Sequence, residues 1–354
     1  TTMPDTLRLS EIAARLPDGA RIAGADPLIT GVTHDSRAVG SGDLFVAIPG
    51  AVVDGHDYVD RAVASGAAAV AVERDMECPS RIVVPDARAA LPWLAAAAYG
   101  DPSRHLPVVG VTGTNGKTTV THLLERIIIA SGRVPGVVGT IGARIGRAEE
   151  SVARTTPEAS DLQRLLAEMI DAGVDIAAIE VSSHALSLHR VDAVRFRVAA
   201  FTNLMQDHLD FHGDMERYFA AKASLFTADR AEHAVVGVDD DAGREIASST
   251  GVPTTTVSLN RDADVTASSL EETFDGSAFS MNTPAGSFPA YLPIPGSFNV
   301  HNALVAGAIA LELGIDAEAV VRGFASATLI PGRFERITGG TGPVVVVDYA
   351  HTPD

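Results

Sequence analysis

The sequence predicts an α/β protein with an N-terminal mixed α/β domain in residues 1–104 and a central domain in residues 105–331. In the central domain, apolar strand-like runs alternate with amphipathic helical patterns, which is typical of a mostly parallel sheet. Residues 263–292 are instead rich in Thr, Ser and Gly with short alternating runs, so we expect a small antiparallel insertion there. Residues 332–354 contain a fresh apolar strand and indicate the beginning of a third α/β domain.

Composition and charge narrow the class of protein. At 354 residues, with 46% hydrophobic and 20% charged residues, the chain is long enough for two or three ordinary globular domains. It has no run of about 18 apolar residues and no signal-peptide pattern, so we expect a cytoplasmic protein that does not insert into a membrane. We also expect it to be a monomer. The single cysteine, Cys78, excludes an internal disulfide. The formal net charge of −18 argues against a nucleic-acid partner, which requires a basic surface.

Short strands and helices alternate in the N-terminal domain. The expected strands are residues 44–48, 67–72 and 81–84. The expected helices are residues 57–65 and 88–99, which end at Gly66 and Gly100. A polar stretch bracketed by Pro102 and Pro107 is the predicted linker to the central domain.

The central domain opens with a strand, a glycine loop and a helix in residues 108–131. Unpaired N–H groups at the start of such a helix bind anions, Lys117 adds a positive charge, and the Thr118 hydroxyl can ligate Mg²⁺. The spacing is a shorter variant of the strict phosphate-loop pattern, because Val111 stands where that pattern has its first glycine. A glycine turn without a ligand is the alternative, but the Lys-Thr pair favours a nucleotide-phosphate site and a P-loop ATPase-like domain.

Strands and helices continue to alternate after this loop. The expected strands are residues 134–138, 176–181, 198–201 and 234–238. The expected helices are a segment that starts at 156–158 and segments at about 216–227, 299–313 and 316–327. At the start of the first of these helices, Thr156 is the predicted capping hydroxyl and Pro157 the first helical residue.

Lysine is rare in this chain. Of the 27 basic residues, Lys117 and Lys222 are the only lysines, so the other 25 are arginines. The two lysines are therefore candidates for chemistry that requires an amine. An uncharged amine reacts with CO₂ to give a carbamate, which is a carboxylate-like metal ligand, whereas arginine stays protonated. A solvent-exposed helix lysine is the alternative at Lys222, but the scarcity of lysine favours the carbamate.

Polar side chains follow two predicted strands of the central sheet. Glu180 and Asn203 would lie at the carboxyl edge of the sheet, where ligands bind in open parallel sheets. A buried glutamate is costly unless paired or metal-bound, which favours a metal ligand over a partly exposed strand-end carboxylate. Residues 202–213 also bring together Asp207, His208, Asp210 and His212, whose roles are either metal and phosphate contacts or ordinary caps and turns.

Several segments in combination resemble the Mur ligases, and in particular the UDP-N-acetylmuramoyl-tripeptide synthetases. These segments are GTNGKT, RTTPE, EVSSHAL, TNLMQDHLDFHG, YFAAKASLF, PGSFNVHNAL, PGRFE and DYAHTPD. The resemblance covers residues 33–354 and depends on the combination, because a glycine loop alone is not specific. It implies an ATP- and Mg²⁺-dependent ligase of peptidoglycan precursor synthesis, and hence a part in cell wall formation, cell shape and cell division. Its implied partners are UDP-N-acetylmuramoyl-L-alanyl-D-glutamate and a diamino acid.

The resemblance also implies a reaction and residue roles. The D-glutamate carboxylate attacks ATP to give an acyl phosphate, and the amine of the third amino acid then displaces phosphate. The implied ATP-binding residues are Gly113, Thr114, Asn115, Gly116, Lys117, Thr118, Thr119, Asn302, Arg333 and Asp348. The implied substrate contacts are Ser36, Thr155, Thr156, Ser182 and Arg190. The implied metal contacts are Thr118, Glu180, His208 and Lys222 as N6-carboxylysine. Lys117, Lys222 and His208 are the implied catalytic residues.

Two positions depart from the pattern of these ligases. Leu188 stands where the family often has glutamine, which leaves one substrate contact open. Gly237 and Val238 precede the Asp239-Asp240 pair, before which many relatives carry an asparagine, so a base contact is also open. Both departures concern ligand contacts and leave the phosphate loop unaffected.

Other readings of the sequence stay open at this point. The alternatives are another Mur ligase, a folylpolyglutamate synthase-like ligase, or a non-catalytic module that binds a UDP-sugar and a nucleotide. The choice between meso-diaminopimelate and L-lysine depends on a motif that we expect beyond residue 354. We also expect residues 1–354 alone to bind the UDP-dipeptide but not to complete ligation, because domain closure excludes water and completes such sites.

Overall fold

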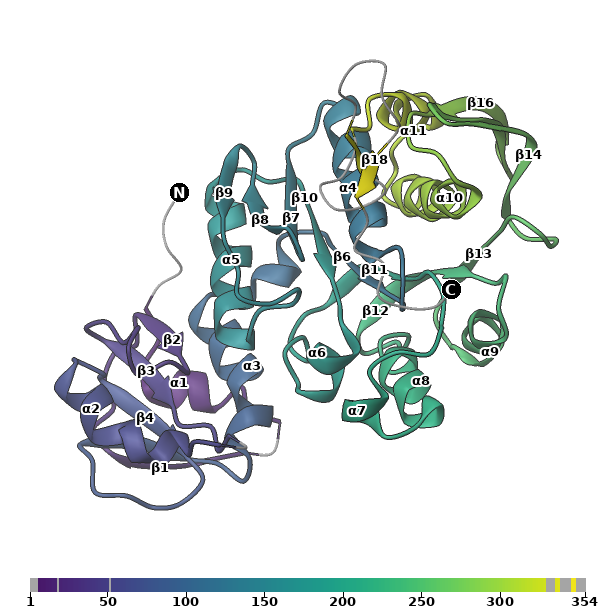
Figure 1. Cartoon of the computed structure of the whole chain (residues 1–354). Helices are drawn as coiled ribbons and strands as arrows, with labels where there is room; N and C mark the ends of the chain where they lie inside the picture. Colours follow the sequence, from purple (N-terminus) through teal and green to yellow (C-terminus); the bar gives the residue numbers. More distant parts are fainter. Residues whose placement is uncertain (1–5, 18, 51, 329–334, 338–344, 348–354) are drawn as a thin grey trace. The chain divides into compact units, whose positions relative to one another are not determined.

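The computed structural model describes residues 6–17, 19–50, 52–328, 335–337 and 345–347 (Figure 1). The chain folds into two compact units. The N-terminal unit consists of Thr1–Leu106, Pro157–Ala172 and Ala185–Val194, and the central unit consists of Pro107–Thr156, Gly173–His184 and Arg195–Asp354. The chain therefore returns to the N-terminal unit twice after leaving it.

The N-terminal unit is built on a five-stranded sheet with the order β1-β5-β4-β3-β2. Its strands are β1 (Arg21–Gly24), β2 (Gly31–Thr33), β3 (Asp43–Val46), β4 (Ala69–Val72) and β5 (Ser80–Val83). Strands β2 to β5 pair in parallel, and β1 pairs with β5 antiparallel. Its helices are α1 (Leu9–Ala13), η1 (Gly55–Tyr58), α2 (Val59–Ala64), α3 (Ala87–Ala98), η2 (Pro102–Arg104) and α5 (Ala159–Asp171).

Helix α5 belongs to the core of this unit although it follows the phosphate loop in sequence. It contacts α3 and β2, and Ala159 at its first position is buried in the same apolar cluster as Leu44, Leu91 and Leu94. Burial of these aliphatic side chains holds the sheet and the helices together. The N-terminal unit is therefore complete only with a segment from later in the chain.

The central unit is built on one eleven-stranded sheet with the order β16-β15-β14-β13-β12-β11-β6-β10-β7-β8-β9. The strands from β14 to β7 pair in parallel, and antiparallel strands extend the sheet at both ends. The strands are β6 (Val108–Thr112), β7 (Pro135–Gly139), β8 (Gly142–Ile145), β9 (Ala148–Glu150), β10 (Ile176–Glu180), β11 (Phe196–Phe201), β12 (Ala231–Gly237), β13 (Thr254–Ser258), β14 (Val265–Thr273), β15 (Gly276–Thr283) and β16 (Gly286–Leu292). The predicted mostly parallel sheet and its antiparallel insertion are confirmed.

Three helices cover one face of this sheet. They are α4 (Lys117–Ala130), α10 (Ser297–Glu312) and α11 (Ala317–Ala325), which lie beside one another in Figure 1 and contact one another. Their apolar residues form one buried cluster with alternate residues of the parallel strands, such as Val109 and Val111 of β6. This packing fixes the start of α4 against the carboxyl end of β6.

Shorter elements complete the described part of the central unit. They are α7 (Leu209–His212), α8 (Met215–Ala223), α9 (Asp241–Ser249) and the antiparallel pair β17 (Glu335–Ile337) and β18 (Val345–Val347), with α6 (Ser183–Ser187) at the boundary of the two units. No helix in the part of the chain that the structure describes is both long enough and apolar enough to cross a membrane.

Several details differ from the sequence-based expectation. The hairpin β8–β9 was not predicted, because its strands are short, the residues of β9 are all exposed, and the segment shows no regular alternation of apolar and polar residues. Helix α9 and strand β13 were also not predicted. Thr156 does not cap α5, which begins at Ala159 with Glu158 at the N-cap position. The Thr156 hydroxyl instead donates to the backbone oxygen of Glu180 at 2.8 Å, and this long-range bond replaces the expected local one.

Candidate active site

The loop between β6 and α4 requires glycine at two positions. Gly113 and Gly116 have φ angles of 145° and 87°, where side chains are disfavoured, and the helix begins at the next residue, Lys117. A Cβ atom on Gly113 would overlap the hydroxyl of Thr202, and one on Gly116 would overlap the side-chain oxygen of Asn302. The loop is therefore packed closely on both sides. This packing fixes the first N–H groups of α4, which form the predicted anion site.

The end of strand β11 holds the loop in place. The Thr202 hydroxyl donates to the backbone oxygen of Asn115 at 2.6 Å. The side-chain oxygen of Asn203 accepts from the N–H of Asn115 at 3.0 Å, and its backbone oxygen accepts from the N–H of Thr114 at 2.9 Å. Asn203 was expected at this edge of the sheet. Thr202 was not singled out, although it is the first polar residue after the same apolar strand.

Both lysines of the chain donate to one backbone oxygen of this loop. Lys117 Nζ lies 2.9 Å from the oxygen of Gly113 and 2.8 Å from that of Thr114. Lys222 Nζ lies 2.8 Å from the same oxygen of Gly113, although Lys222 is far away in sequence on helix α8. The rarity of lysine singled out both residues, and the structure adds that their amines lie on the same oxygen.

Lys222 is in an environment that disfavours its charged form. The side chain is 1% exposed, and burial lowers the pKa of its amine well below the usual value, with a further lowering by the charge of Lys117. The amine lies 4.5 Å from the ring centre of Tyr218, four residues earlier on α8. The spacing of four residues on a predicted helix could have identified Tyr218, because such residues share a face.

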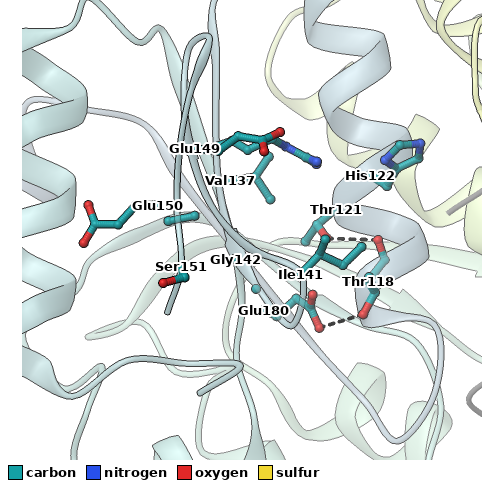
Figure 2. A pocket seen from close by; sticks show the side chains of 13 residues that line it. Thr118, Thr121, His122, Val137, Ile141, Gly142, Glu149, Glu150, Ser151 and Glu180 are labelled. Atoms are coloured by element: carbon teal, nitrogen blue, oxygen red, sulfur yellow. Dashed lines mark hydrogen bonds between the residues drawn. The ribbon is translucent and has the colours of Figure 1, made fainter. Parts of the chain in front are cut away.

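Glu180 ends strand β10 with its carboxylate beside the start of α4. The side chain is 1% exposed, and the Thr118 hydroxyl donates to Oε2 at 3.0 Å (Figure 2). The backbone N–H and hydroxyl of Thr140 donate to Oε1 and Oε2 at 2.9 and 3.1 Å. Gly139 leaves room for the carboxylate, because a Cβ there would overlap Oε1. Glu180 and Thr118 are therefore adjacent as predicted, whereas the role of Thr140 was missed.

This arrangement fits Mg²⁺ that binds together with a nucleotide. In the residues that the structure describes, no three His, Cys, Asp or Glu side chains are grouped as a metal site. The protein supplies one carboxylate and one hydroxyl, from Glu180 and Thr118, next to the phosphate loop. Mg²⁺ commonly takes only one or two protein ligands and completes its shell with phosphate oxygens and water. The residues present are suited to that mode of binding.

A pocket of about 210 Å³ extends from this pair beneath the β8–β9 hairpin. Figure 2 shows Thr118 and Glu180 on one side, His122 on α4, and Glu149 and Glu150 on the hairpin.

A buried charge cluster lies along the same face of helix α4. Arg144 donates to Glu125 at 2.7 Å, and His122 Nδ1 lies 3.7 Å from the same carboxylate oxygen. Burial, assisted by the charges of Arg126 and Arg144, lowers the pKa of His122 from 6.5 to about 4. His122 is therefore neutral near pH 7.

His208 lies among aromatic rings near Lys222. Its backbone is left-handed, with φ at 52°, and its Nε2 lies 3.3 Å from Asp207. The ring centre lies 4.8 Å from that of His184 and 6.3 Å from that of Tyr218. Burial lowers the pKa of His208, and the charges of Lys117 and Lys222 add to this effect. A neutral imidazole is thereby favoured, which is the form that can accept a hydrogen bond or bind a metal.

The predicted substrate contacts of the central unit gather around the end of β10. Ser182 N–H donates to the Thr156 hydroxyl at 3.1 Å, and the hydroxyls of Thr140 and Thr155 lie 3.1 Å apart. The Thr140 hydroxyl bonds the carboxylate of Glu180 and the Thr156 hydroxyl bonds its backbone oxygen, so the two groups of hydroxyls are linked through Glu180. The structure therefore brings Thr155, Thr156 and Ser182 together.

The N-terminal unit contains the other two predicted substrate contacts. Ser36 is buried in the turn after β2. Arg190 is also buried and lies 2.9 Å from Glu158, which Arg88 approaches at 3.6 Å. Such a buried ion pair fixes the guanidinium in one orientation. Glu158 was predicted only as part of a helix start, so this pairing was missed. Arg333 and Asp348, two predicted ATP contacts, lie outside the described residues.

Family models and relatives match most of the chain. The model of the Mur ligase middle domain matches residues 111–310, and that of the Mur ligase family, catalytic domain, matches residues 28–99. The UDP-N-acetylmuramoyl-L-alanyl-D-glutamate--2,6-diaminopimelate ligase of Geobacillus thermodenitrificans is 41% identical over 98% of this chain and 73% of the relative. The enzyme of the same name from Streptomyces coelicolor is 44% identical over 98% of this chain and 70% of the relative.

Solved structures show the same similarity. A structure of a UDP-N-acetylmuramoyl-L-alanyl-D-glutamate--2,6-diaminopimelate ligase has a TM-score of 0.83 and 30% identity, over 99% of this chain and 72% of that one. MurF from Acinetobacter baumannii has a TM-score of 0.73 and 25% identity, over 98% of this chain and 74% of that one. Mycobacterium tuberculosis folylpolyglutamate synthase shares the fold alone. Its structure has a TM-score of 0.61 and 22% identity, over 73% of this chain and 66% of that one.

Proposed function

The chain belongs to the Mur ligase family, and from this membership we propose that it joins 2,6-diaminopimelate to UDP-N-acetylmuramoyl-L-alanyl-D-glutamate in an ATP-dependent reaction. The names of the relatives that are 41% and 44% identical support this choice of dipeptide and amino acid. The reaction would add the third residue of a peptidoglycan precursor peptide. With ATP and a UDP-sugar as substrates, we place it in the cytoplasm.

The proposed chemistry has two steps. The D-glutamate carboxylate attacks the γ-phosphorus of ATP, so that an acyl phosphate forms and ADP leaves. The amine of the amino acid then attacks the acyl carbon, an amide bond forms, and inorganic phosphate leaves. Lys117 and the first N–H groups of α4 would stabilise the negative charge of the transferring phosphoryl group. Lys117 already lies over the loop, on the oxygens of Gly113 and Thr114.

Thr118 and Glu180 are the proposed protein contacts of Mg²⁺. When bound, the ion would neutralise phosphate charge and orient the β- and γ-phosphates. The hydroxyl and backbone N–H of Thr140 hold the carboxylate of Glu180 toward Thr118. This support fixes the position of the carboxylate before any ligand arrives, which lowers the cost of binding.

Lys222 is proposed to carry a carbamate, and His208 to assist it at a second metal position. The lowered pKa of Lys222 favours the uncharged amine that attacks CO₂. The remaining N–H of the carbamate can still donate to the oxygen of Gly113, so the present hydrogen bond at 2.8 Å is compatible with the modification. The carbamate charge would also offset the positive charge of Lys117 beside it.

Proposed contacts to the muramoyl dipeptide come from Arg190 in the N-terminal unit and from Thr155, Thr156 and Ser182 in the central unit. Ser36 is the proposed contact to uridine. Arg190 is suited to a carboxylate because its guanidinium is fixed by Glu158 at 2.9 Å. The three hydroxyls can each donate or accept a hydrogen bond.

The observation that carries the proposal is the convergence of Lys117 and Lys222 on the oxygen of Gly113, beside the Thr118–Glu180 pair. The test is calorimetry of the purified chain with ADP and with UDP-N-acetylmuramoyl-L-alanyl-D-glutamate, its tripeptide form, and a tetrahydrofolate glutamate. We expect binding of ADP and the dipeptide substrate. Preference for the tripeptide form would favour the MurF reaction, and preference for the folate would favour a folylpolyglutamate synthase.

A further inference from the structure

His301 on α10 is a buried side chain that the proposed reaction does not use. It is 9% exposed, and its Nε2 has no hydrogen-bond partner among the described residues. The nearest acidic atom, Oδ2 of Asp239, lies 3.6 Å from this nitrogen, too far for a hydrogen bond. Buried polar atoms in folded proteins are almost always bonded, so an atom of this kind indicates a missing ligand or water.

The imidazole of His301 lies close to the phosphate loop. The next residue, Asn302, packs directly against Gly116 of the loop. The ring itself lies at the end of β12, because a Cβ on Gly237 would come within 2.9 Å of its Cε1 and Nε2. Gly237 thus leaves room for the ring of His301. Any side chain at position 237 would have to share that space.

The order of the strands gives the direction in which a nucleotide would extend. The phosphate loop follows β6, Glu180 ends the neighbouring β10, and Gly237 ends β12, which is two strands from β6 on the other side. Neighbouring strands are about 4.8 Å apart, so Gly237 lies about 10 Å across the sheet from the loop. That distance is close to the length of a nucleoside. A nucleotide with its metal-bound phosphates toward Glu180 therefore places its base near His301.

The negative charge of Asp239 influences which nitrogen of the His301 ring carries the proton. Its carboxylate accepts from the Ser258 hydroxyl at 2.5 Å and from the backbone N–H groups of Leu259 and Asn260 at 3.1 and 3.2 Å. A carboxylate held near Nε2 favours the tautomer with a proton on Nε2, because the alternative would turn a lone pair toward the negative charge. Burial lowers the pKa of His301 and keeps the ring neutral.

We propose that His301 recognises the purine base of the nucleotide, with its Nε2–H donating to a ring nitrogen of adenine. The inference rests on the proposed function in that it takes a nucleotide on the phosphate loop as its ligand. In this reading His301 contacts the base, and Gly237 allows this because it has no side chain that would take the space of the ring.

The test compares nucleotide binding by three forms of the chain. His301→Phe fills the same space without a polar atom, and His301→Gln restores a donor near the position of Nε2. Each form is titrated calorimetrically with ADP and with its 1-deaza, 3-deaza and 7-deaza analogues, each of which replaces one ring nitrogen by carbon. We expect His301→Phe to bind ADP about five- to tenfold more weakly than the unaltered chain, which is the effect of one lost hydrogen bond.

The analogues identify the contact. One deaza analogue should bind the unaltered chain five- to tenfold more weakly than ADP yet bind His301→Phe as well as ADP does, because the two changes remove the same hydrogen bond. His301→Gln should recover part of the loss. His233→Phe is the matched control, since His233 lies on β12 and bonds Thr255 at 3.1 Å, and it should bind ADP normally.

Two results would overturn the inference. One is ADP binding by His301→Phe that equals that of the unaltered chain, which would make His301 a packing residue. The other is an equal loss with ADP and all three analogues in both His301 variants, which would indicate a structural effect. Failure of the unaltered chain to bind ADP at all would instead refute the proposed function.

Discussion

Replacement of Gly139 by alanine should displace the carboxylate of Glu180 and weaken binding of the Mg²⁺-nucleotide complex. A Cβ at this position would overlap Oε1 and would lie 2.8 and 2.9 Å from Cδ and Cγ of Glu180. These distances are shorter than real Cβ contacts, so the carboxylate must turn away. Turning breaks hydrogen bonds from Thr118 and Thr140 at 2.9–3.1 Å.

The size of the effect follows from these bonds. A hydrogen bond to a charged group is worth about 1.5–3 kcal/mol, and loss of the aligned carboxylate removes at least one such interaction with the metal. We expect affinity for Mg²⁺-ADP to fall about tenfold to 150-fold. Affinity for ADP in the presence of EDTA should change little, because the phosphate loop itself is unaltered. Calorimetric titrations with and without Mg²⁺ measure both values.

Gly251→Ala is the matched control for this substitution. A Cβ on Gly251 would meet no atom within 4 Å, and this glycine lies between α9 and β13. It should keep the Mg²⁺ dependence of the unaltered chain. If Gly139→Ala also keeps that dependence while the protein remains folded, the carboxylate of Glu180 is not the metal contact and the reasoning is refuted.

Three further predictions concern side chains described above. In a full-length background, Lys117→Arg should abolish ATP turnover but leave UDP-dipeptide binding intact, because a planar guanidinium cannot place a compact charge on the loop; near-normal phosphate release by that variant would contradict this. With ¹³CO₂ at neutral pH, NMR should show a carbamate resonance that Lys222→Ala lacks, and its absence from the unaltered chain would contradict the proposed modification. The pKa of His122 is lowered from 6.5 to about 4 in the folded protein, so between these pH values the unfolded chain binds more protons at His122 than the folded chain does. Acidification through this range therefore lowers the free energy of unfolding by up to about 3 kcal/mol. His122→Gln should flatten the pH dependence of urea unfolding between pH 6.5 and 4, and parallel curves would refute this.

Much of the fold and part of the site could be predicted from local patterns. The strand, glycine loop and helix around Lys117 follow from residue spacing alone, and Glu180 was placed correctly because parallel strands end at one edge of a sheet. The scarcity of lysine singled out Lys222, and the structure places it on the loop. These features depend on periodicity or composition, which a single sequence displays.

Other features depend on contacts between distant residues. Thr140 supports Glu180 across 40 positions in the sequence, and nothing near Thr140 indicates this partner. Thr156 has the local pattern of a helix cap, but its hydroxyl bonds Glu180 instead, because a tertiary partner replaced the local one. The β8–β9 hairpin was missed because its strands are short and the residues of β9 are all exposed. Such features require the folded structure.

The discontinuous N-terminal unit has a consequence for synthesis on the ribosome. Its sheet and helix α3 are made first, but α5, which packs on α3 and β2, is encoded by residues 159–171, and the last segment of the unit ends at Val194. Domains generally fold during synthesis from the N-terminus onward. Here the first unit cannot be completed until Val194 has been made. The nascent chain must therefore keep the α5-facing side of α3 uncovered while the phosphate loop emerges.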